Sequence, residues 1–310
     1  MLLVNIADSA SVAKSTLELI HVAREAGAAA HLLLIGPTAA AQASELTSFV
    51  NHISTADVPL SADAITTAIA TKRAELGSDV VIMPASKTGL SVSPRVAIRE
   101  GLGLLEDVTE LSFEGSTVTA KRLTYLSRVT ETVSANTPVF VTVKPNVFPA
   151  AESSGASADV AVHDVALGDA DTRVTIGAQH EAATGSVALE EADIVVAGGR
   201  GLGDAATFNS LIEPLAAKLG AGIGATRAVV DADWRPYSEQ IGQTGKAVAP
   251  GLYFAFGISG AVQHLSGMNR SKTIVAVNKD ADAPIFKIVD YGYVGDATEF
   301  IPALINALDN

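Results

Sequence analysis

The sequence predicts an α/β protein with two domains: an N-terminal parallel-sheet domain with added antiparallel strands, and a C-terminal doubly wound domain. In the first and last parts of the chain, short apolar runs alternate with segments that carry apolar residues at helical spacing. This alternation is typical of parallel sheets covered by helices. The length of 310 residues is sufficient for two ordinary domains.

The N-terminal part contains the first alternating pattern. Its predicted strands are Leu2–Ala7, His31–Ile35, His52–Ser54 and Asp79–Pro84, and its predicted helices are Ser11–Glu25, Thr38–Phe49, Ala62–Leu76 and Pro94–Gly101. Because helices connect consecutive strands, the strands are expected to form a parallel sheet with helices on its faces.

Three further apolar runs follow without helical segments between them. They are Asp107–Phe113, Thr117–Leu123 and Val139–Pro145, and turns separate them. Antiparallel strands can be joined by tight turns, whereas parallel strands need a longer crossover. We therefore expect these runs to add antiparallel strands to the first sheet.

The segment between the two alternating parts predicts a domain boundary. Residues Ala150–Ala158 read AAESSGASA, a small, polar, Gly/Ser-containing run that is typical of a surface loop. The chain then continues through Gln179–Gly185 without a long periodic element. We place the boundary near residue 187, which gives domains of residues 1–187 and 188–310.

The alternation starts again in the C-terminal domain. The predicted strands are Asp193–Ala197, Gly224–Val229, Leu252–Gly257, Lys272–Asn278 and Ile285–Asp290, and the predicted helices are Ala206–Leu219, Gly260–Met268 and Ala297–Leu308. This order predicts a doubly wound sheet. Ligands of such sheets bind beyond the carboxyl ends of the strands.

The composition limits the kinds of chemistry available. The chain has no cysteine, which excludes disulfides, cysteine-ligated metals and thiol catalysis. A net charge of −13 disfavours binding to nucleic acid or to an anionic membrane surface. The N-terminus lacks the basic start of a secretory signal, and no apolar run is long enough for membrane insertion. We expect a cytoplasmic protein.

Polar residues follow the predicted strands of the C-terminal domain. They are Arg200, Thr226, Arg227, Gln243, Thr244, Ser259 to His264, Asn278 and Asp296. We find no G-x-S-x-G or H-E-x-x-H motif and no evident pair of catalytic carboxylates. Donors and cations without a nucleophile suit an anionic cofactor whose electronic properties the protein adjusts.

The run Gly242–Lys246 reads GQTGK and has some features of a phosphate-binding loop. Only two residues separate its glycines, whereas that loop has four, and Ala247 replaces the Ser or Thr that would hold magnesium. The motif therefore predicts a turn, with Gly242 and Gly245 present for positive φ angles.

The run Gly198–Asp204 reads GGRGLGD and lies between a predicted strand and a helix, where dinucleotides bind. Gly199 and Gly201 match the first two glycines of the G-x-G-x-x-G fingerprint, but Asp204 occupies the position of the third. On spacing alone, this run is a weak indication of a nicotinamide site.

Three long motifs resemble the electron transfer flavoprotein α subunit. They are Gly224–Trp234 (GATRAVVDADW), Gln240–Met268 (QIGQTGKAVAPGLYFAFGISGAVQHLSGM) and Ser271–Asp296 (SKTIVAVNKDADAPIFKIVDYGYVGD), with further similarity at VVAGGRGLGD, Ser93–Ala97 and Val143–Ala151. The resemblance covers essentially the whole chain. It implies an N-terminal α/β domain that packs on a β subunit and a C-terminal doubly wound domain that holds FAD.

The resemblance also implies roles for individual residues. Arg200 matches an arginine near the phosphates of the cofactor. Thr226 stands where many members have serine, and Arg227 matches the arginine beside the isoalloxazine ring. Asn278 and Asp296 match positions that fix the adenosine half.

Two further segments are implied to lie along the flavin. Gln240, Gln243 and Thr244 match a loop beside the flavin and ribityl chain, with the Thr244 hydroxyl near N5. The segment Gly257 to His264 matches the pyrophosphate and pyrimidine contacts, which include Gly257, Ser259, Gln263 and His264. One-electron reduction places negative charge near N1 and C2=O, so a cation or donor there, His264 with Arg227 nearby, would stabilise it.

By this resemblance the chain is half of a heterodimer and an electron carrier without its own substrate. The β subunit would carry AMP, and the complex would pass electrons from acyl-CoA and related dehydrogenases of fatty acid oxidation to a membrane quinone oxidoreductase. Two alternatives stay open: a stand-alone nicotinamide- or flavin-dependent oxidoreductase, and a subunit that serves only in assembly. The missing third glycine and the absence of a general acid disfavour the oxidoreductase.

Overall fold

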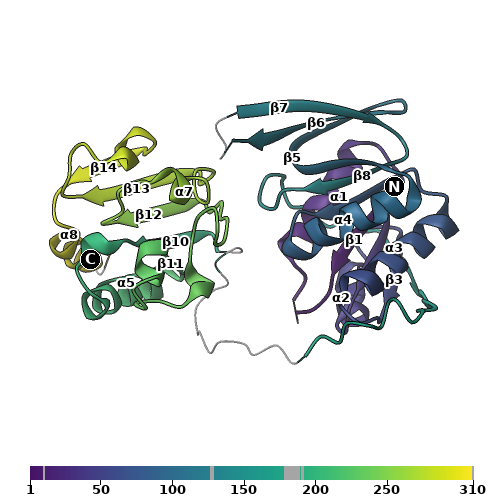
Figure 1. Cartoon of the computed structure of the whole chain (residues 1–310), viewed down its shortest axis with the longest axis horizontal. Helices are drawn as coiled ribbons and strands as arrows, with labels where there is room; N and C mark the ends of the chain where they lie inside the picture. The colour runs from purple at the N-terminus through teal and green to yellow at the C-terminus, as the bar shows by residue number, and fades with distance from the viewer. Residues whose placement is uncertain (10, 126–128, 178–188, 190–191, 309–310) are drawn as a thin grey trace. The chain divides into compact units, whose positions relative to one another are not determined.

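The computed structural model describes residues 1–9, 11–125, 129–177, 189 and 192–308. The chain forms two compact units, Met1–His180 and Glu181–Asn310, and both have α/β folds, as predicted (Figure 1). The predicted boundary near residue 187 lies outside the described residues.

The described residues of the N-terminal unit form a nine-stranded sheet in the order β7-β6-β5-β8-β4-β1-β2-β3-β9. Its strands are β1 Leu2–Ile6, β2 His31–Ile35, β3 His52–Ala56, β4 Val80–Pro84, β5 Gly103–Glu114, β6 Thr117–Thr124, β7 Val129–Asn136, β8 Val139–Val143 and β9 Asp159–Val162. Its helices are α1 Lys14–Glu25, α2 Ala39–Leu46, α3 Ala62–Leu76 and α4 Lys87–Glu100.

Helices pack on both faces of this sheet, and they bury the side chains of its central strands on both sides. In β1, the side chain of Leu3 belongs to the hydrophobic cluster that contains α1 and α2. The neighbouring side chains of Leu2 and Val4 belong to the cluster that contains α3 and α4. This alternation follows from the two-residue period of a strand. Strands buried on both faces give the continuous apolar runs that made them predictable.

The prediction that Val139–Pro145 adds an antiparallel strand is wrong. Strand β8 runs parallel to both β4 and β5 and lies between them. The start of β5 pairs with β8, and after a register shift its later part pairs antiparallel with β6. The first part of the long strand β5 therefore belongs to the parallel part of the sheet, and its later part belongs to the antiparallel part, which β6 and β7 complete.

The C-terminal unit contains a five-stranded parallel sheet in the order β11-β10-β12-β13-β14. Its strands are β10 Ile194–Gly198, β11 Gly222–Ala225, β12 Leu252–Phe256, β13 Thr273–Asn278 and β14 Tyr291–Val294, and its helices are α5 Ala205–Leu219, α6 Arg227–Val230, α7 Val262–Leu265 and α8 Ala297–Ala307. The chain winds in opposite directions from β10 and from β12, so the doubly wound prediction is confirmed. The topological switch point lies between these two strands.

Two predicted strands of this unit need correction. The run Ile285–Asp290 is not a strand: Pro284–Lys287 forms a 3₁₀ helix, and the edge strand is β14. Ile285 lies in this 3₁₀ helix and is fully buried, whereas the residues of β14 are exposed. The buried apolar residues of the 3₁₀ helix were therefore mistaken for the edge strand. The predicted strand Gly224–Val229 ends at Ala225, because α6 begins directly after Thr226.

Glu18 has a buried carboxyl group in the N-terminal unit. Glu18 on α1 is only 1% exposed, and its two carboxylate oxygens accept the backbone N–H of Asn146, each at 3.0 Å. Burial raises the pKa of Glu18 from 4.5 to about 7, opposed by the hydrogen bond from Asn146 and by the charge of Lys14. The folded state thus holds a proton that the unfolded chain releases at lower pH.

We expect Glu18→Gln to stabilise the N-terminal unit above pH 7 by roughly 1–3 kcal/mol and to change its stability little near pH 4. The raised pKa means that the wild-type residue favours folding below about pH 4.5 and loses that contribution as the pH rises to about 7. Thermal unfolding of both proteins across this range measures the difference. Glu25→Gln, at an exposed position of the same helix, is the control. A stability difference that does not vary with pH would contradict the assignment.

Candidate functional site

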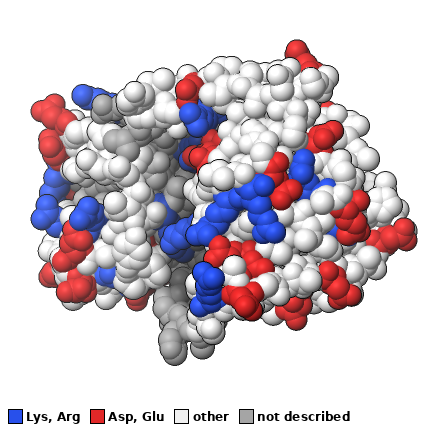
Figure 2. All heavy atoms as spheres, turned by 45° about the vertical axis from the view of Figure 1, so that its right-hand side comes forward, with Lys and Arg blue, Asp and Glu red and all other residues white. Residues whose placement is uncertain are grey.

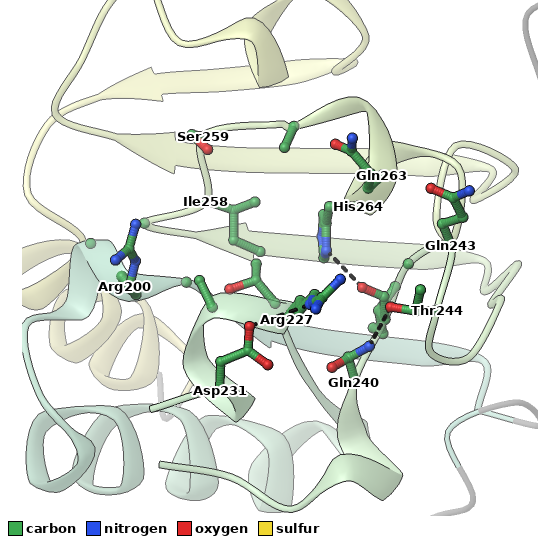
Figure 3. Close-up of a pocket in the computed structure, with 18 of the residues that line it drawn as sticks. Arg200, Arg227, Asp231, Gln240, Gln243, Thr244, Ile258, Ser259, Gln263 and His264 are labelled. Atoms are coloured by element: carbon green, nitrogen blue, oxygen red, sulfur yellow. Dashed lines mark hydrogen bonds and ion pairs between the residues drawn. The ribbon is translucent and has the colours of Figure 1, made fainter. Parts of the chain in front are cut away.

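A cavity of about 610 Å³ lies at the carboxyl ends of β10, β11 and β12. Its walls come from the loops after these strands, from the turn at residues 240–244 and from α7 (Figure 3). The volume is within the range of small-molecule sites. The cavity includes the switch point between β10 and β12, where doubly wound sheets bind their ligands.

The structure brings together all but one of the predicted site residues. Those that line the cavity are Arg200, Thr226, Arg227, Gln240, Gln243, Thr244, Gly257, Ser259, Gln263, His264 and Asn278. Asp296 is not among the lining residues. Its carboxylate accepts the backbone N–H of Thr298 at 2.9 Å and pairs with Lys279 at 2.9 Å. Lys279 and then Thr298 lower the pKa of Asp296 to about 2, and the residue caps helix α8.

The loops after β10 and β12 touch each other at glycines. A Cβ on Gly199 would lie 2.3 Å from the carbonyl oxygen of Gly257, and one on Gly201 would lie 2.7 Å from the same oxygen. The backbone N–H of Gly201 donates to that oxygen at 3.1 Å. These glycines are required because the two loops pack backbone to backbone. In the nicotinamide fingerprint, by contrast, the second glycine lets the backbone approach the pyrophosphate.

Asp204 explains the missing third glycine. Its carboxylate accepts the backbone N–H of Thr207 at 2.7 Å and caps the N-terminus of α5. Because this carboxylate already accepts a backbone N–H at the start of the helix and brings negative charge there, the helix N-terminus is a poor site for a phosphate. The weak nicotinamide indication from this run is therefore not supported by the local structure.

Two arginines bring positive charge to the cavity. Arg200 lies in a 3₁₀ helix after β10, and within the described part of the chain its guanidinium has no hydrogen-bond or ion-pair partner. Arg227 is the first residue of α6, and its Nε lies 3.3 Å from Oδ2 of Asp231. Both side chains of this pair are exposed, so the ion pair is weak and leaves Arg227 available to a ligand. The sequence prediction missed Asp231, although its i+4 spacing from Arg227 on a helix was a usable signal.

The turn predicted at Gly242–Lys246 is confirmed, but the positive φ predicted for both of its glycines is right for Gly242 and wrong for Gly245. Gly242 has a φ of 140°, whereas Gly245 does not have a positive φ. A Cβ on Gly245 would lie 2.3 Å from the carbonyl oxygen of Gln240, so the residue is small because the turn is tight. The backbone N–H of Gln243 donates to the carbonyl of Gln263 at 2.7 Å, which fixes the turn to α7.

Gln240 holds Thr244 in place. The side chain of Gln240 is only 3% exposed, and its Nε2 donates to the hydroxyl oxygen of Thr244 at 3.0 Å. The hydroxyl of Tyr237 donates to the backbone carbonyl of Thr244. Since the Thr244 oxygen accepts from Gln240, its own O–H is left to donate into the cavity. Tyr237 was missed because it acts through the backbone of another residue.

His264 is buried, and both of its ring nitrogens have hydrogen-bond partners. Its side chain is 6% exposed, its Nδ1 lies 3.1 Å from the carbonyl oxygen of Ile241, and its Nε2 lies 3.0 Å from the hydroxyl of Tyr253. Burial lowers the pKa of His264 to about 4, opposed by the hydrogen bond to Ile241. Of the two roles predicted for His264, cation or hydrogen-bond donor, the lowered pKa disfavours the cation, and the arginines that line the cavity carry its positive charge. The role of donor stays a prediction.

Within the described residues, no group of three or more acidic or histidine side chains could hold a metal ion. The fold and the cavity thus define a cofactor-binding α/β protein whose site offers hydrogen-bond donors and cations. Among the described residues, no helix has the length and apolar character needed to cross a membrane.

The sequence matches two family models, one described as electron transfer flavoprotein domain over residues 2–168 and one described as electron transfer flavoprotein FAD-binding domain over residues 188–269. The chain belongs to the electron transfer flavoprotein α-subunit family, as its motifs indicated, and it binds FAD. Every predicted cofactor contact that lines the cavity lies in the matched FAD-binding segment except Asn278.

Several relatives support this assignment, and all are named electron transfer flavoprotein subunit alpha. The protein of Bacillus subtilis is 45% identical over 228 residues, which cover 73% of this chain and 69% of the relative. The protein of Thermoanaerobacterium thermosaccharolyticum is 39% identical over 285 residues, 89% of this chain and 86% of the relative. The protein of Pseudomonas aeruginosa is 38% identical over 307 residues, 97% of each chain.

We expect Gly199→Ala to weaken FAD binding by about tenfold or more. The added methyl group would meet a backbone oxygen at 2.3 Å, and overpacking of this kind typically costs about 1–3 kcal/mol. Titration of the flavin-free protein with FAD, followed by flavin fluorescence, measures the change. Gly251→Ala is the matched control, because there the nearest atom is 3.4 Å away, at the opposite end of β12. Equal affinities for the two variants would contradict the role of the loop contact.

Proposed function

We propose that this chain is the FAD-carrying α subunit of a heterodimeric electron transfer flavoprotein. Hydrogen-bond donors and two cations, Arg200 and Arg227, converge on the cavity at the switch point, and most of them lie in the segment that matches the family's FAD-binding domain. That convergence is the observation that carries the proposal. The relatives are named as alpha subunits, which supports a partner β subunit, proposed to carry AMP.

The residues of the cavity fit this cofactor in chemical type. Arg200, which has no partner among the described residues, supplies a cation for a phosphate, and the exposed hydroxyl of Ser259 and amide of Gln263 supply polar contacts nearby. Arg227 and the O–H of Thr244 are proposed to face the ring system. FAD, when bound, accepts and releases single electrons. The role of this chain is to hold it and to stabilise negative charge that develops on the ring.

The proposed route begins with acyl-CoA and related dehydrogenases of fatty acid oxidation and ends at a membrane quinone oxidoreductase, with this protein in the cytoplasm. The side chains shown in Figure 2 include Lys and Arg lying among Asp and Glu, although the whole chain has a net charge of −13. That acidic excess supports a freely diffusing carrier over one that adheres to nucleic acid or to anionic lipid.

The alternative, a stand-alone oxidoreductase, needs a proton donor beside its substrate. His264 is buried with both ring nitrogens hydrogen-bonded, and Asp231 pairs with Arg227. Neither side chain suits general acid catalysis in this arrangement.

The proposal is tested by producing the chain with its partner subunit and recording the visible spectrum, the bound FAD and the electron transfer from an acyl-CoA dehydrogenase. A yellow complex that is reduced only in the presence of the dehydrogenase and its substrate supports the carrier function. A complex that stays colourless after addition of FAD contradicts it, and direct oxidation of acyl-CoA by the complex would favour the oxidoreductase.

Arg227→Ala is expected to lower the first-electron potential of the bound flavin by roughly 20–90 mV. Removal of an exposed positive charge beside the ring costs about 0.5–2 kcal/mol of stabilisation for the reduced state. Spectroelectrochemical titration measures the potential. Arg227→Lys keeps the charge and should fall between the two proteins. An unchanged potential in Arg227→Ala would reject the placement of this residue beside the ring.

Asp231→Asn is expected to shift the same potential in the opposite direction, upward. The carboxylate lies 3.3 Å from the guanidinium of Arg227 and partly cancels its charge at the cavity. The amide keeps the size of the side chain and removes its negative charge. The same titration at low and high salt provides the check, since the shift of an exposed charge should shrink as salt increases. A downward shift would contradict this arrangement of charges.

A further inference from the structure

Arg235 is the centre of a group of ionic and polar contacts in the C-terminal unit. It lies between α6 and the 3₁₀ helix Tyr237–Glu239, its side chain is 12% exposed, and it is not among the residues that line the cavity. Its Nε and one terminal nitrogen donate to the two carboxylate oxygens of Glu239 at 2.6 and 2.7 Å. Because the Glu239 side chain is only 6% exposed, this two-bond contact is largely shielded from water.

The same guanidinium also contacts helix α5. Its other terminal nitrogen donates to the side-chain oxygens of Asn209 at 2.9 Å and Glu213 at 2.5 Å. Its Cζ lies over the ring of Phe208, 5.6 Å from the ring centroid. Phe208 is fully buried in a hydrophobic cluster, so this part of α5 is held by close packing. All three nitrogens of Arg235 are thus engaged, and together they join the 3₁₀ helix to α5.

Tyr237 in this 3₁₀ helix and Gln240 directly after it both hold Thr244. The hydroxyl of Tyr237 donates to the backbone carbonyl of Thr244. Nε2 of Gln240 donates to the Thr244 hydroxyl at 3.0 Å (Figure 3). The backbone N–H of Lys246 donates to the carbonyl of Gln240 at 2.7 Å, which closes the turn that carries Thr244. The position of Thr244 therefore depends on where the 3₁₀ helix lies.

The chemistry of arginine suits a group that holds a segment in place. Buried ion pairs often add little net stability, because desolvation of the charges offsets their attraction. The planar guanidinium, however, presents its donors in a fixed fork, which restricts the geometry of its partners. A lysine has one nitrogen and cannot make the two-bond contact to Glu239 together with the contacts to α5.

We infer that Arg235 is a positioning residue that pins the 3₁₀ helix Tyr237–Glu239 to α5 and so fixes the Thr244 hydroxyl on the wall of the cavity. The inference rests on the proposed placement of Thr244 beside the flavin ring. A fixed donor needs no reorganisation when negative charge develops on the ring. Without these contacts the hydroxyl would spend part of its time turned away from the ring, and the reduced flavin would be less stable.

The first experiment measures hydrogen exchange of the backbone amides of residues 242–246, in the full chain assembled with its partner subunit without FAD. The variant is Arg235→Met/Glu239→Gln, which keeps the net charge and leaves no unpaired carboxylate buried at position 239. We expect these amides to exchange about three- to tenfold faster, because the turn loses its anchor. Lys121→Met/Glu110→Gln, which removes an exposed ion pair with the same change of charge, is the matched control and should leave their exchange unchanged.

The amides of β12 provide the internal reference for this experiment. If the contacts of Arg235 position the turn, the amides of β12 keep their exchange rates while those of residues 242–246 become faster. Unchanged exchange of the turn in the double variant would overturn the inference. An equal acceleration in β12 would also overturn it, because the contacts would then stabilise the whole unit rather than hold the turn.

The second experiment measures the first-electron potential of the FAD-loaded complex. Tyr237→Phe removes only the hydroxyl that holds the Thr244 carbonyl, and it should lower the potential. Arg235→Met/Glu239→Gln should lower it too, and Arg235→Lys should give a smaller shift in the same direction. These shifts should vanish in a Thr244→Val background, since the contacts act through that hydroxyl. Tyr291→Phe, at an exposed tyrosine of β14, is the matched control and should leave the potential unchanged.

The two experiments separate this inference from the proposed function. Failure of the complex to bind FAD would contradict the proposed function, while the exchange rates would still decide whether Arg235 anchors the turn. A complex that binds FAD but keeps its potential in Tyr237→Phe and in the double variant would overturn the inference alone. Shifts of equal size in the Thr244→Val background would also overturn it, because the contacts would then act on the flavin by another path.

Discussion

The backbone contact between the loops after β10 and β12 is the constraint on which the rest of the site depends. Gly199 and Gly201 lie so close to Gly257 that neither position has room for a Cβ. Arg200 and Ser259, which line the cavity, lie in the two loops that this contact holds together. A parallel doubly wound sheet opens a crevice at this point by its topology alone. The glycines determine how narrow that crevice is.

A second level of order comes from buried side chains that hold the exposed ones. Gln240 orients the hydroxyl of Thr244, and Tyr253 orients the ring of His264. Both supporting residues are buried and hydrogen-bonded to the groups they hold, so those groups are arranged before any ligand binds. Such preorganisation lowers the reorganisation that accompanies a change of charge on a cofactor. This is the property that an electron carrier requires.

The sequence predicted buried strands better than exposed ones. Strand β2, whose residues are almost all buried, was predicted with its observed bounds, whereas the four-residue strands β9 and β14 are exposed and were not predicted. The residues that line the cavity were predicted from two features of the sequence: their positions after the carboxyl ends of the strands, and the family resemblance. The contact of Tyr253 with His264 was not predicted, because a tyrosine within an apolar strand looks like any other core residue and only its hydroxyl makes this hydrogen bond.

Binding of a partner subunit would affect the exposed charges of Arg227 and Asp231 differently from the buried imidazole ring of His264. Arg227 and Asp231 are 67% and 62% exposed in the chain by itself, so water and salt weaken their influence on the cavity. If the partner β subunit covered the cavity, it would remove that water and strengthen both charges. His264 is already buried, and its hydrogen bonds lie within this chain. Assembly would therefore adjust the flavin potential mainly through the exposed pair, while the hydrogen bonds of the imidazole stay set by the fold.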